Sequence, residues 1–403
     1  MPFNLTLKKI LLIVGFILVS VGIGFAIYFL FFKAPAEKTP ITAEDVTGTS
    51  GLPTSGLAGA RPATPTVTVA PTLPTAEEVS TANLTLTEAS SITLSADGTS
   101  INYYDPNSGL FYKIDSSGLL TPLSNKEFYQ VKEATWSKDS KKAVLEYPDG
   151  SNIIYDFSSD TQVSLPKHWE DFEFSSDGSK VISKSIGDDI KNRWLTITDS
   201  KGTNTKIIAA LGDNADKVQV AWSPNNQVVG FSRTGDPTSS FGTQEVYLLG
   251  QNKENFRSLK VNGFNFKAKW STEGDRLMYN VTDTTNDYKP ALWVVDASSG
   301  NIGSNAVKVN LDTWVDKCAV VSGYKAYCAV PKKLEKGAGL QPAVANKSDD
   351  AFYLVDLKTG ATTFIGEPDT DYSVKQISVD KNENYIFFTD RATGALHQMP
   401  IGS

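Results

Sequence analysis

The 403-residue chain contains few cysteines, histidines and arginines, which often catalyse reactions, bind metal ions or bind anions. It has two cysteines and two histidines, His168 and His397, and only six of its 38 basic residues are arginine. It contains no metal-ligand spacing and no G-x-S-x-G nucleophile elbow. The scarcity of arginine argues against a clamp for phosphate or carboxylate groups. We therefore predict no catalytic residue, no metal site and no cofactor.

Basic residues are outnumbered by acidic residues, 38 to 45. The formal net charge is −7, and Lys8, Lys9 and Lys33 lie near the N-terminus, so the rest of the chain is more acidic still. A protein that binds nucleic acid needs a basic surface to meet the phosphates. We therefore predict no nucleic-acid partner.

Charge is absent from the 23 residues between Ile10 and Phe32. At about 1.5 Å per residue, a helix of this length crosses a hydrocarbon core of about 30 Å. We predict a transmembrane helix over residues 10–32, with a short cytoplasmic leader over residues 1–9. The short leader is typical of an uncleaved signal anchor and places the following chain outside the cytoplasm. The alternative is a cleaved signal peptide with its small-residue site at Ala34–Ala36.

Aromatic residues are absent between Phe32 and Tyr103, while seven prolines fall between Ala34 and Ala82 among Thr, Ala, Gly and Ser. Such a segment has too little apolar surface to offset the entropy lost on folding. We predict a disordered Pro/Thr-rich linker over residues 33–82, with a passive tether as the simplest role.

Within the predicted propeller domain, residues 83–403, one pattern recurs about seven times from Ile92 onward: an apolar strand, a turn with Ser and Asp, Asn or Gly, a second strand, and a third that ends near Asp. In six copies the turn begins with a serine: Ser95, Ser137, Ser175, Ser223, Ser271 and Ser378. The remaining copy has the altered turn Ser322-Gly323. Units of about 40–50 residues with several strands are typical of propeller blades, because one blade cannot bury both its faces alone. We predict an all-β fold, a seven-bladed β-propeller. Bulky residues at one equivalent position of four copies should fill the space between blades: Trp136, Phe174, Trp222 and Trp270.

The opening Trp222-Ser223-Pro224-Asn225 nearly matches W-S-P-D-G, the signature of TolB-like (WD-like) propeller repeats, which are related to the propellers of prolyl-oligopeptidase-type peptidases. Residues 84–401 resemble this family. The segment Tyr327–Pro331 is also similar to a stretch of single-pass, membrane-anchored bacterial propeller proteins. The resemblance implies a β-propeller fold. TolB itself carries an additional N-terminal α/β domain where this chain has the predicted helix and linker.

The seventh copy lacks a fourth strand, because the chain ends soon after its third strand at Leu396–Ile401. The short alternating segment Asn83–Thr87 precedes the first copy and belongs to no blade. Pairing it with the last blade would cover an exposed sheet edge and join the two ends of the ring. We predict that Asn83–Thr87 is the outer strand of the seventh blade.

The two cysteines, Cys318 and Cys328, lie in the predicted first two strands of the sixth blade, Lys317–Val321 and Lys325–Val330. The three-residue turn between these strands sets a register in which the cysteines are directly opposed. Opposed residues have Cα atoms about 4.5–5.5 Å apart, within the range of a disulfide, and such a bond persists outside the cytoplasm. We predict this disulfide. The alternatives are two free thiols, or a register shifted by one residue.

The connections between second and third strands are longest in four adjacent blades, the third to the sixth: Ser185–Asn192, Thr234–Thr243, Asp283–Pro290 and Lys332–Asp349. In a propeller these connections share one face, and long loops on a rigid scaffold often bind partners. The candidate partner-binding residues in these loops are Phe241, Tyr288, Lys332, Lys333 and Lys336. The three lysines lie on an otherwise acidic domain. The alternative is that the loops are tolerated insertions.

Taken together, these features predict a membrane-anchored β-propeller outside the cytoplasm that binds a protein or a cell-envelope polymer and does no chemistry. One alternative is a propeller enzyme of the lactonase, lyase or hydrolase type with its site in the central channel. The other is a structural spacer in the envelope. The sequence does not identify the partner.

Overall fold

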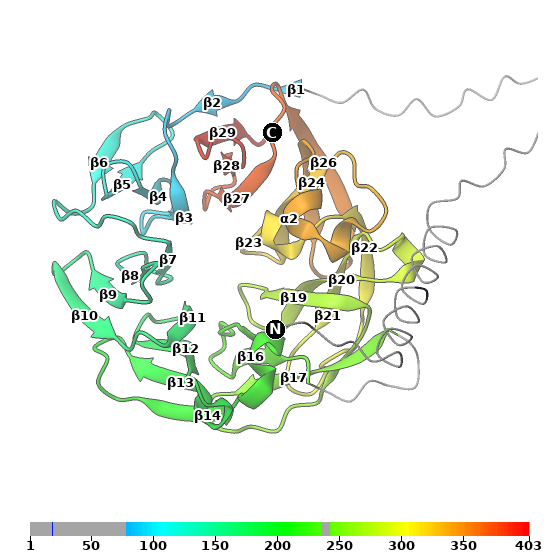
Figure 1. The fold of residues 1–403 in the computed structure, drawn as a ribbon. Helices are drawn as coiled ribbons and strands as arrows, with labels where there is room; N and C mark the ends of the chain where they lie inside the picture. Colours follow the sequence, from blue (N-terminus) through cyan, green and yellow to red (C-terminus); the bar gives the residue numbers. More distant parts are fainter. Residues whose placement is uncertain (1–17, 19–77, 235–241, 403) are drawn as a thin grey trace, which may run out of the picture. The chain divides into compact units, whose positions relative to one another are not determined.

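The computed structural model describes Leu18, residues 78–234 and residues 242–402. From residue 78 onward the described chain forms seven small sheets that follow one another around a ring (Figure 1). Within each sheet, strands that follow one another in the sequence pair antiparallel. The prediction of an all-β, seven-bladed β-propeller is confirmed.

The first four blades each use four consecutive strands. The first contains β3 (Ser90–Leu94), β4 (Ile101–Asp105), β5 (Leu110–Ile114) and β6 (Leu120–Pro122). The second contains β7 (Glu133–Trp136), β8 (Lys142–Glu146), β9 (Asn152–Asp156) and β10 (Thr161–Leu165). The third contains β11 (Trp169–Phe174), β12 (Lys180–Ile186), β13 (Arg193–Asp199) and β14 (Lys206–Ala210). The fourth contains β15 (Val218–Val220), β16 (Val228–Ser232), β17 (Thr243–Gly250) and β18 (Leu259–Asn262).

The fifth blade also uses four consecutive strands: β19 (Phe264–Trp270), β20 (Arg276–Thr282), β21 (Pro290–Asp296) and β22 (Val307–Asp312).

The last two blades, the sixth and the seventh, each receive an additional strand from the N-terminal side. The sixth contains β23 (Cys318–Val321), β24 (Lys325–Pro331), β25 (Asp350–Asp356) and β26 (Thr362–Pro368), with β1 (Glu78–Val79) outside β26. The seventh contains β27 (Val374–Val379), β28 (Tyr385–Asp390) and β29 (Leu396–Pro400), with β2 (Ala82–Asn83) outside β29.

Short helices occur only in the connections of the described chain. They are the 3₁₀ helices η1 (Ile190–Asn192), η2 (Gly212–Lys217), η3 (Thr284–Asn286), η4 (Val315–Lys317) and η5 (Ala338–Leu340), and the α-helix α2 (Pro342–Ala345). In the part of the chain that the structure describes, no helix is long and apolar enough to cross a membrane. The predicted leader 1–9, the predicted helix 10–32 apart from Leu18, and most of the predicted linker lie outside the described residues.

Aromatic side chains fill the space between neighbouring blades. Trp270 of the fifth blade stacks on Phe231 of the fourth with 5.5 Å between ring centroids. Trp136 of the second blade meets Phe111 of the first edge-on at 5.5 Å. Trp222 packs among buried residues of the third and fourth blades. Burial of each such side chain contributes about 2–3 kcal/mol, so the predicted role of these residues is confirmed.

The recurrent Ser and Asp residues stabilise the turns between first and second strands. In the first blade, one carboxylate oxygen of Asp97 accepts the backbone N–H groups of Thr99 and Ser100 and the hydroxyl of Ser95. Gly98 between them has φ +75°, a conformation that glycine adopts without strain. These residues are therefore needed for the turn and not for a ligand.

The disulfide between Cys318 and Cys328 is present and joins β23 to β24. The two cysteines are directly opposed in the antiparallel register, and their Cα atoms are 4.0 Å apart. Both are fully buried, in a cluster that also contains residues of the fifth blade. The predicted disulfide is confirmed.

The N-terminal segment joins the sixth blade to the seventh. β1 pairs in parallel with β26, and β2 pairs antiparallel with β29, with Asn83 opposite His397. The paired strand is thus Ala82–Asn83, while the expected segment was Asn83–Thr87. Beyond β2, the N–H groups of Leu84 and Thr85 still donate to Leu396 O. The strand β1 lies inside the predicted linker 33–82, because two paired residues are too few to show a period in the sequence.

We expect that deleting residues 82–87 lowers the melting temperature by about 5 °C. The deletion removes β2 and the bonds of Leu84 and Thr85 at the one seam where the ring is not covalently continuous. Scanning calorimetry of the full-length chain measures the effect. A deletion of the same length at residues 72–77 is the control, because it leaves β1 and β2 in place. Equal melting temperatures for the two deletions would show that β2 does not stabilise the ring.

Candidate functional site

We call the face of the ring that carries the connections between second and third strands the loop face. In four blades these connections are long. Three of these turns contain short helices: η1 in the third blade, η3 in the fifth, and η5 with α2 in the sixth. Figure 1 shows α2 toward the centre of the ring. The connection of the sixth blade, which contains α2, therefore lies beside the mouth of the central channel.

The connection of the sixth blade is attached to that of the fifth. Gly337 N donates to Asp287 O and Gly339 N donates to Tyr288 O, both at 2.8 Å. A Cβ atom at Gly339 would collide with the side chain of Thr282 and with Tyr288 O, so only glycine allows this close approach. The two connections thus form one continuous wall.

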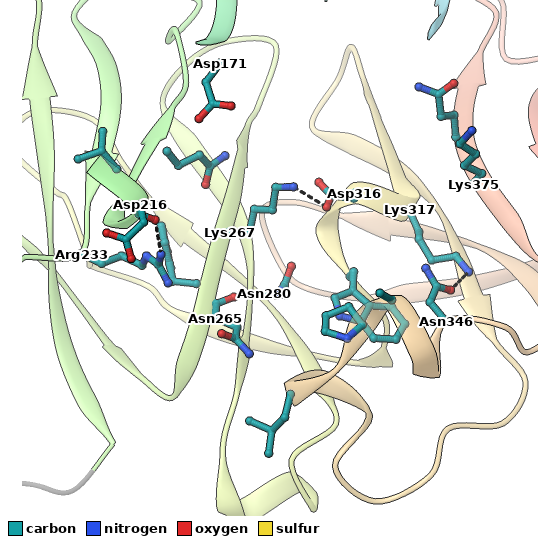
Figure 2. Close-up of a pocket in the computed structure, with 18 of the residues that line it drawn as sticks. Asp171, Asp216, Arg233, Asn265, Lys267, Asn280, Asp316, Lys317, Asn346 and Lys375 are labelled. Carbon is teal, nitrogen blue, oxygen red and sulfur yellow. Dashed lines mark hydrogen bonds and ion pairs between the residues drawn. The ribbon is translucent and has the colours of Figure 1, made fainter. Parts of the chain in front are cut away.

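Beneath this wall lies a cavity of about 790 Å³, which we call the channel-mouth cavity. Its lining comes from the third to seventh blades, mostly from the ends of the first two strands nearest the loop face (Figure 2). The lining residues are Asp171, Lys184, Asp216, Val218, Gln219, Arg233, Asn265, Phe266, Lys267, Asn280, Trp314, Asp316, Lys317, Leu340, Pro342, Ala343, Asn346, Lys375, Gln376 and Arg391. A volume of this size accommodates a small molecule or a short segment of a polymer.

Ion pairs hold several of the charged side chains in the wall. Lys184 Nζ lies 2.6 Å from Asp171 Oδ2, and Lys267 Nζ lies 2.7 Å from Asp316 Oδ2. Figure 2 shows the second pair bridging the cavity wall between the fifth and sixth blades. Two of the three lining carboxylates, Asp171 and Asp316, thus lie beside lysines, while Asp216 forms no ion pair among the described residues.

Lys317 anchors the far wall of the cavity from a buried position. Its Nζ lies 2.6 and 2.7 Å from the two carboxylate oxygens of Asp350, and 2.7 Å from Asn346 Oδ1. Val374 N also donates to Asp350, at 2.7 Å. Burial lowers the pKa of Lys317 and raises the pKa of Asp350, while the contact between them opposes both shifts. The pair connects the sixth blade to the seventh and holds Asn346 in the wall.

Two arginines in the wall donate only to backbone carbonyls. Arg233 donates to Asp216 O at 2.9 Å and to Lys217 O at 3.4 Å, and Arg391 donates to Val374 O at 3.5 Å. Among the described residues, neither arginine forms an ion pair with a carboxylate. Each therefore keeps free N–H donors at the cavity.

Neutral polar side chains complete the wall. Asn265 Nδ2 donates to Gly339 O at 3.0 Å, and Asn280 Nδ2 donates to Asn265 O at 3.2 Å. Val315 N in turn donates to Asn280 Oδ1 at 3.0 Å. The indole N–H of Trp314 is buried and has no acceptor among the described residues. An unpaired buried donor carries a free-energy cost.

The predicted partner-binding residues that the structure describes are not part of the cavity wall. Phe241 lies outside the described residues, and Tyr288 contributes its carbonyl to the contact with Gly339. Each lysine meets an acid: Lys332 with Glu367 at 2.7 Å, Lys333 with Glu335 at 3.0 Å, and Lys336 with Asp287 at 3.3 Å. The hydrogen bond that Lys332 donates to Glu367 raises the pKa of Lys332. The three lysines are thus neutralised locally and do not gather into one basic patch.

Sequence reasoning did not find Arg233, Arg391 or Trp314. They belong to three different blades, and no spacing in the sequence relates them. The one available signal was the rarity of arginine: two of the six arginines in the chain line this single cavity.

At five of the junctions between neighbouring blades, a side chain on the innermost strand of one blade forms a hydrogen bond to the next blade. Each one bonds to the backbone of the following blade: Ser91 to Ala134, Glu173 to Trp222, Gln219 to Ala268, Lys269 to Cys318 and Gln376 to Ile92. Among these, Glu173 is the acidic member. Burial raises its pKa from 4.5 to about 7.

We expect Glu173→Gln to stabilise the protein at high pH and to leave its stability unchanged in acid. The folded protein holds the proton of Glu173 more tightly than the unfolded chain, so this stabilisation is complete below pH 4.5 and is lost as the pH rises through 7. Glutamine stays neutral and can still accept from Trp222 N. Above pH 7 we expect Glu173→Gln to raise the free energy of unfolding by about 2 kcal/mol, because partial access of water to the side chain limits the effect of burial. Urea unfolding at several pH values measures it.

The exposed Glu170 on the same strand supplies the control for this measurement. Glu170→Gln changes the net charge equally but removes no hydrogen bond to the next blade. A stability difference that is the same at every pH for both variants would show that Glu173 does not titrate differently in the folded protein.

In the part of the chain that the structure describes, no group of three or more His, Cys, Asp or Glu side chains is placed to hold a metal ion. No family model matches the sequence. No curated protein matches it either.

Solved structures match the fold. The Swd1 β-propeller domain of Myceliophteria thermophila is 10% identical, with 80% of this chain and 100% of that chain covered and a TM-score of 0.54. An oligogalacturonate lyase from Vibrio parahaemolyticus is 12% identical, with 81% and 94% covered and a TM-score of 0.51. A chain of a mitotic checkpoint complex is 13% identical, with 87% and 100% covered and a TM-score of 0.54. These likenesses show the propeller fold alone.

Proposed function

We propose that this protein is a non-catalytic binding module whose loop face holds a partner at the channel-mouth cavity. The observation that carries the proposal is the cavity itself, which lies between long connections that are fixed to one another by hydrogen bonds. Two of its three carboxylates, those of Asp171 and Asp316, are paired with lysines, an arrangement that suits recognition better than proton transfer. A rigid wall with free arginine donors binds a ligand without first having to be ordered.

The module is anchored in the cell membrane by the helix proposed for Ile10–Phe32, with the N-terminus in the cytoplasm and the propeller outside. The uncharged run of 23 residues supports the anchor. The disulfide supports an oxidising compartment. The W-S-P-N opening supports membership of the TolB-like propeller repeats, and the partner is a protein or an envelope polymer.

The topology is tested by adding protease to intact cells whose wall has been removed. Release of the propeller into the medium is expected. Complete protection, with digestion only after lysis, would place the propeller in the cytoplasm.

The binding face is tested with a photo-reactive amino acid placed in the full-length chain in the cell that naturally makes it. Leu340 is suited to the loop face, because its side chain is 47% exposed and lines the cavity. Arg257, in a hairpin between third and fourth strands on the opposite face, is the matched control. Cross-linking of a partner from Leu340 and not from Arg257 is expected. Equal labelling from both positions, or none from Leu340, would contradict the proposal.

A propeller enzyme is the second candidate, and one observation favours it. Glu146 and Glu133 are directly opposed on β8 and β7, and burial with help from Glu133 raises the pKa of Glu146 to about 7. A carboxyl group that keeps its proton near neutral pH beside a second carboxylate can act as a general acid. Formation of new reducing ends from polygalacturonate, lost in Glu146→Gln, would support this candidate. No product over a prolonged incubation would exclude that substrate.

A further inference from the structure

The channel-mouth cavity has an excess of positive charge on a chain that is acidic overall. Six basic and three acidic side chains line it, while the formal net charge of the chain is −7. Three of the lysines are held by aspartates at 2.6–2.7 Å. Lys375 contacts Glu88 only at 3.6 Å, and Arg233 and Arg391 form no ion pair in the described part of the chain. Field lines concentrate in such a recess, so it favours an anionic ligand.

The two arginines favour carboxylates that are spaced along a chain. A guanidinium has five N–H donors in a planar fork that matches a carboxylate, and those bonds are stronger than bonds between neutral groups. Arg233 follows the second strand of the fourth blade, and Arg391 follows that of the seventh. Because they come from blades on different sides of the cavity, one small anion cannot satisfy both as well as an extended ligand with several carboxylates.

The rest of the wall favours a peptide over a sugar polymer. Sugar rings pack on open aromatic faces, but the two aromatic side chains of the wall are buried, with Phe266 4% and Trp314 7% exposed. The apolar part of the wall is instead aliphatic, with Leu340 and Pro342, and Leu340 is 47% exposed. Aliphatic side chains of a peptide fit such a surface.

We infer that the channel-mouth cavity binds an extended acidic peptide segment of a partner protein. Carboxylates of the segment meet Arg233 and Arg391, and an apolar side chain of the segment packs on Leu340. This inference rests on the proposed binding function of the loop face and names the chemistry of its partner.

The test uses the full-length chain in detergent and a synthetic hexapeptide of alternating glutamate and leucine, with blocked ends. Trp314 is the one tryptophan in the cavity wall, so its fluorescence reports occupancy, and calorimetry gives the dissociation constant. We expect saturable binding that Arg233→Gln and Arg391→Gln each weaken about tenfold. We also expect binding to weaken at high salt, and the fluorescence change to vanish in Trp314→Phe.

Arg257→Gln is the matched control, because it makes the same charge change on the opposite face and should leave binding unchanged. Arg→Lys variants at 233 and 391 keep the charge and lose the fork, so an intermediate loss of affinity is expected. Melting curves of all variants show whether the fold is retained.

Three results would overturn the inference. The hexapeptide with glutamine in place of glutamate binds equally well, the arginine variants bind as tightly as the parent, or oligogalacturonate binds in place of the peptide. In each case cross-linking from Leu340 still decides the proposed function separately, since that experiment does not depend on the charge of the partner.

Discussion

Replacement of Asp350 by Asn is expected to lower the free energy of unfolding by about 3–5 kcal/mol. The substitution leaves the ammonium group of Lys317 without its counter-ion, and the side chain of Lys317 is only 1% exposed. Two of its three hydrogen bonds go to Asp350, and Val374 N would also lose a charged acceptor. Urea unfolding at pH 7, followed by tryptophan fluorescence, measures the change.

Two further variants distinguish the cost of leaving a buried charge unpaired from the cost of losing an ion pair in general. Asp316→Asn removes an exposed pair with Lys267 and is expected to cost less than about 1 kcal/mol. The double variant Lys317→Met with Asp350→Leu removes both charges, so it should recover most of the stability lost in Asp350→Asn. If Asp350→Asn and Asp316→Asn cost the same, the buried pair does not stabilise the seam between the sixth and seventh blades.

Loss of the disulfide is expected to destabilise the protein by about 3 kcal/mol, or to lower the melting temperature by about 5 °C. The cysteines are ten positions apart, and the crosslink restricts the unfolded chain over that length. Both are fully buried in the core between the fifth and sixth blades, so the double variant Cys318→Ala with Cys328→Ala also loses packing. Scanning calorimetry with and without reductant measures the two contributions.

The comparison between parent and variant provides the internal control. Reductant should lower the melting temperature of the parent and leave that of the double alanine variant unchanged. A parent protein that melts at the same temperature in both conditions would show that the crosslink adds no stability.

Much of the fold could be predicted because its determinants are local. The Ser-x-Asp turns are stabilised within six residues, as Asp97 shows by its bonds to Thr99 and Ser100. One turn length between β23 and β24 was enough to set the register that opposes Cys318 and Cys328. The turn residues recur in neighbouring copies, so an error in one copy leaves the assignment of the others intact.

The candidate site was less predictable, because its side chains converge from separate blades. The sequence showed which connections were long, but it did not show that the lysines of the last one are neutralised by Glu367, Glu335 and Asp287. The rarity of arginine also argued against a site that binds carboxylate groups. The structure places Arg233 and Arg391 at one cavity, so position matters more than number.

What the sequence by itself determined is the repeating blade: the period, the turn residues, the aromatic residues between blades and the cysteine register all depend on neighbours in the chain. What only the tertiary structure decided is which distant groups meet. β1 pairs with β26, nearly 300 residues away, and Lys317 meets Asp350 beneath the connection that contains α2. Two-residue strands and single buried charges have no period, so their partners are set by closure of the ring and not by local sequence.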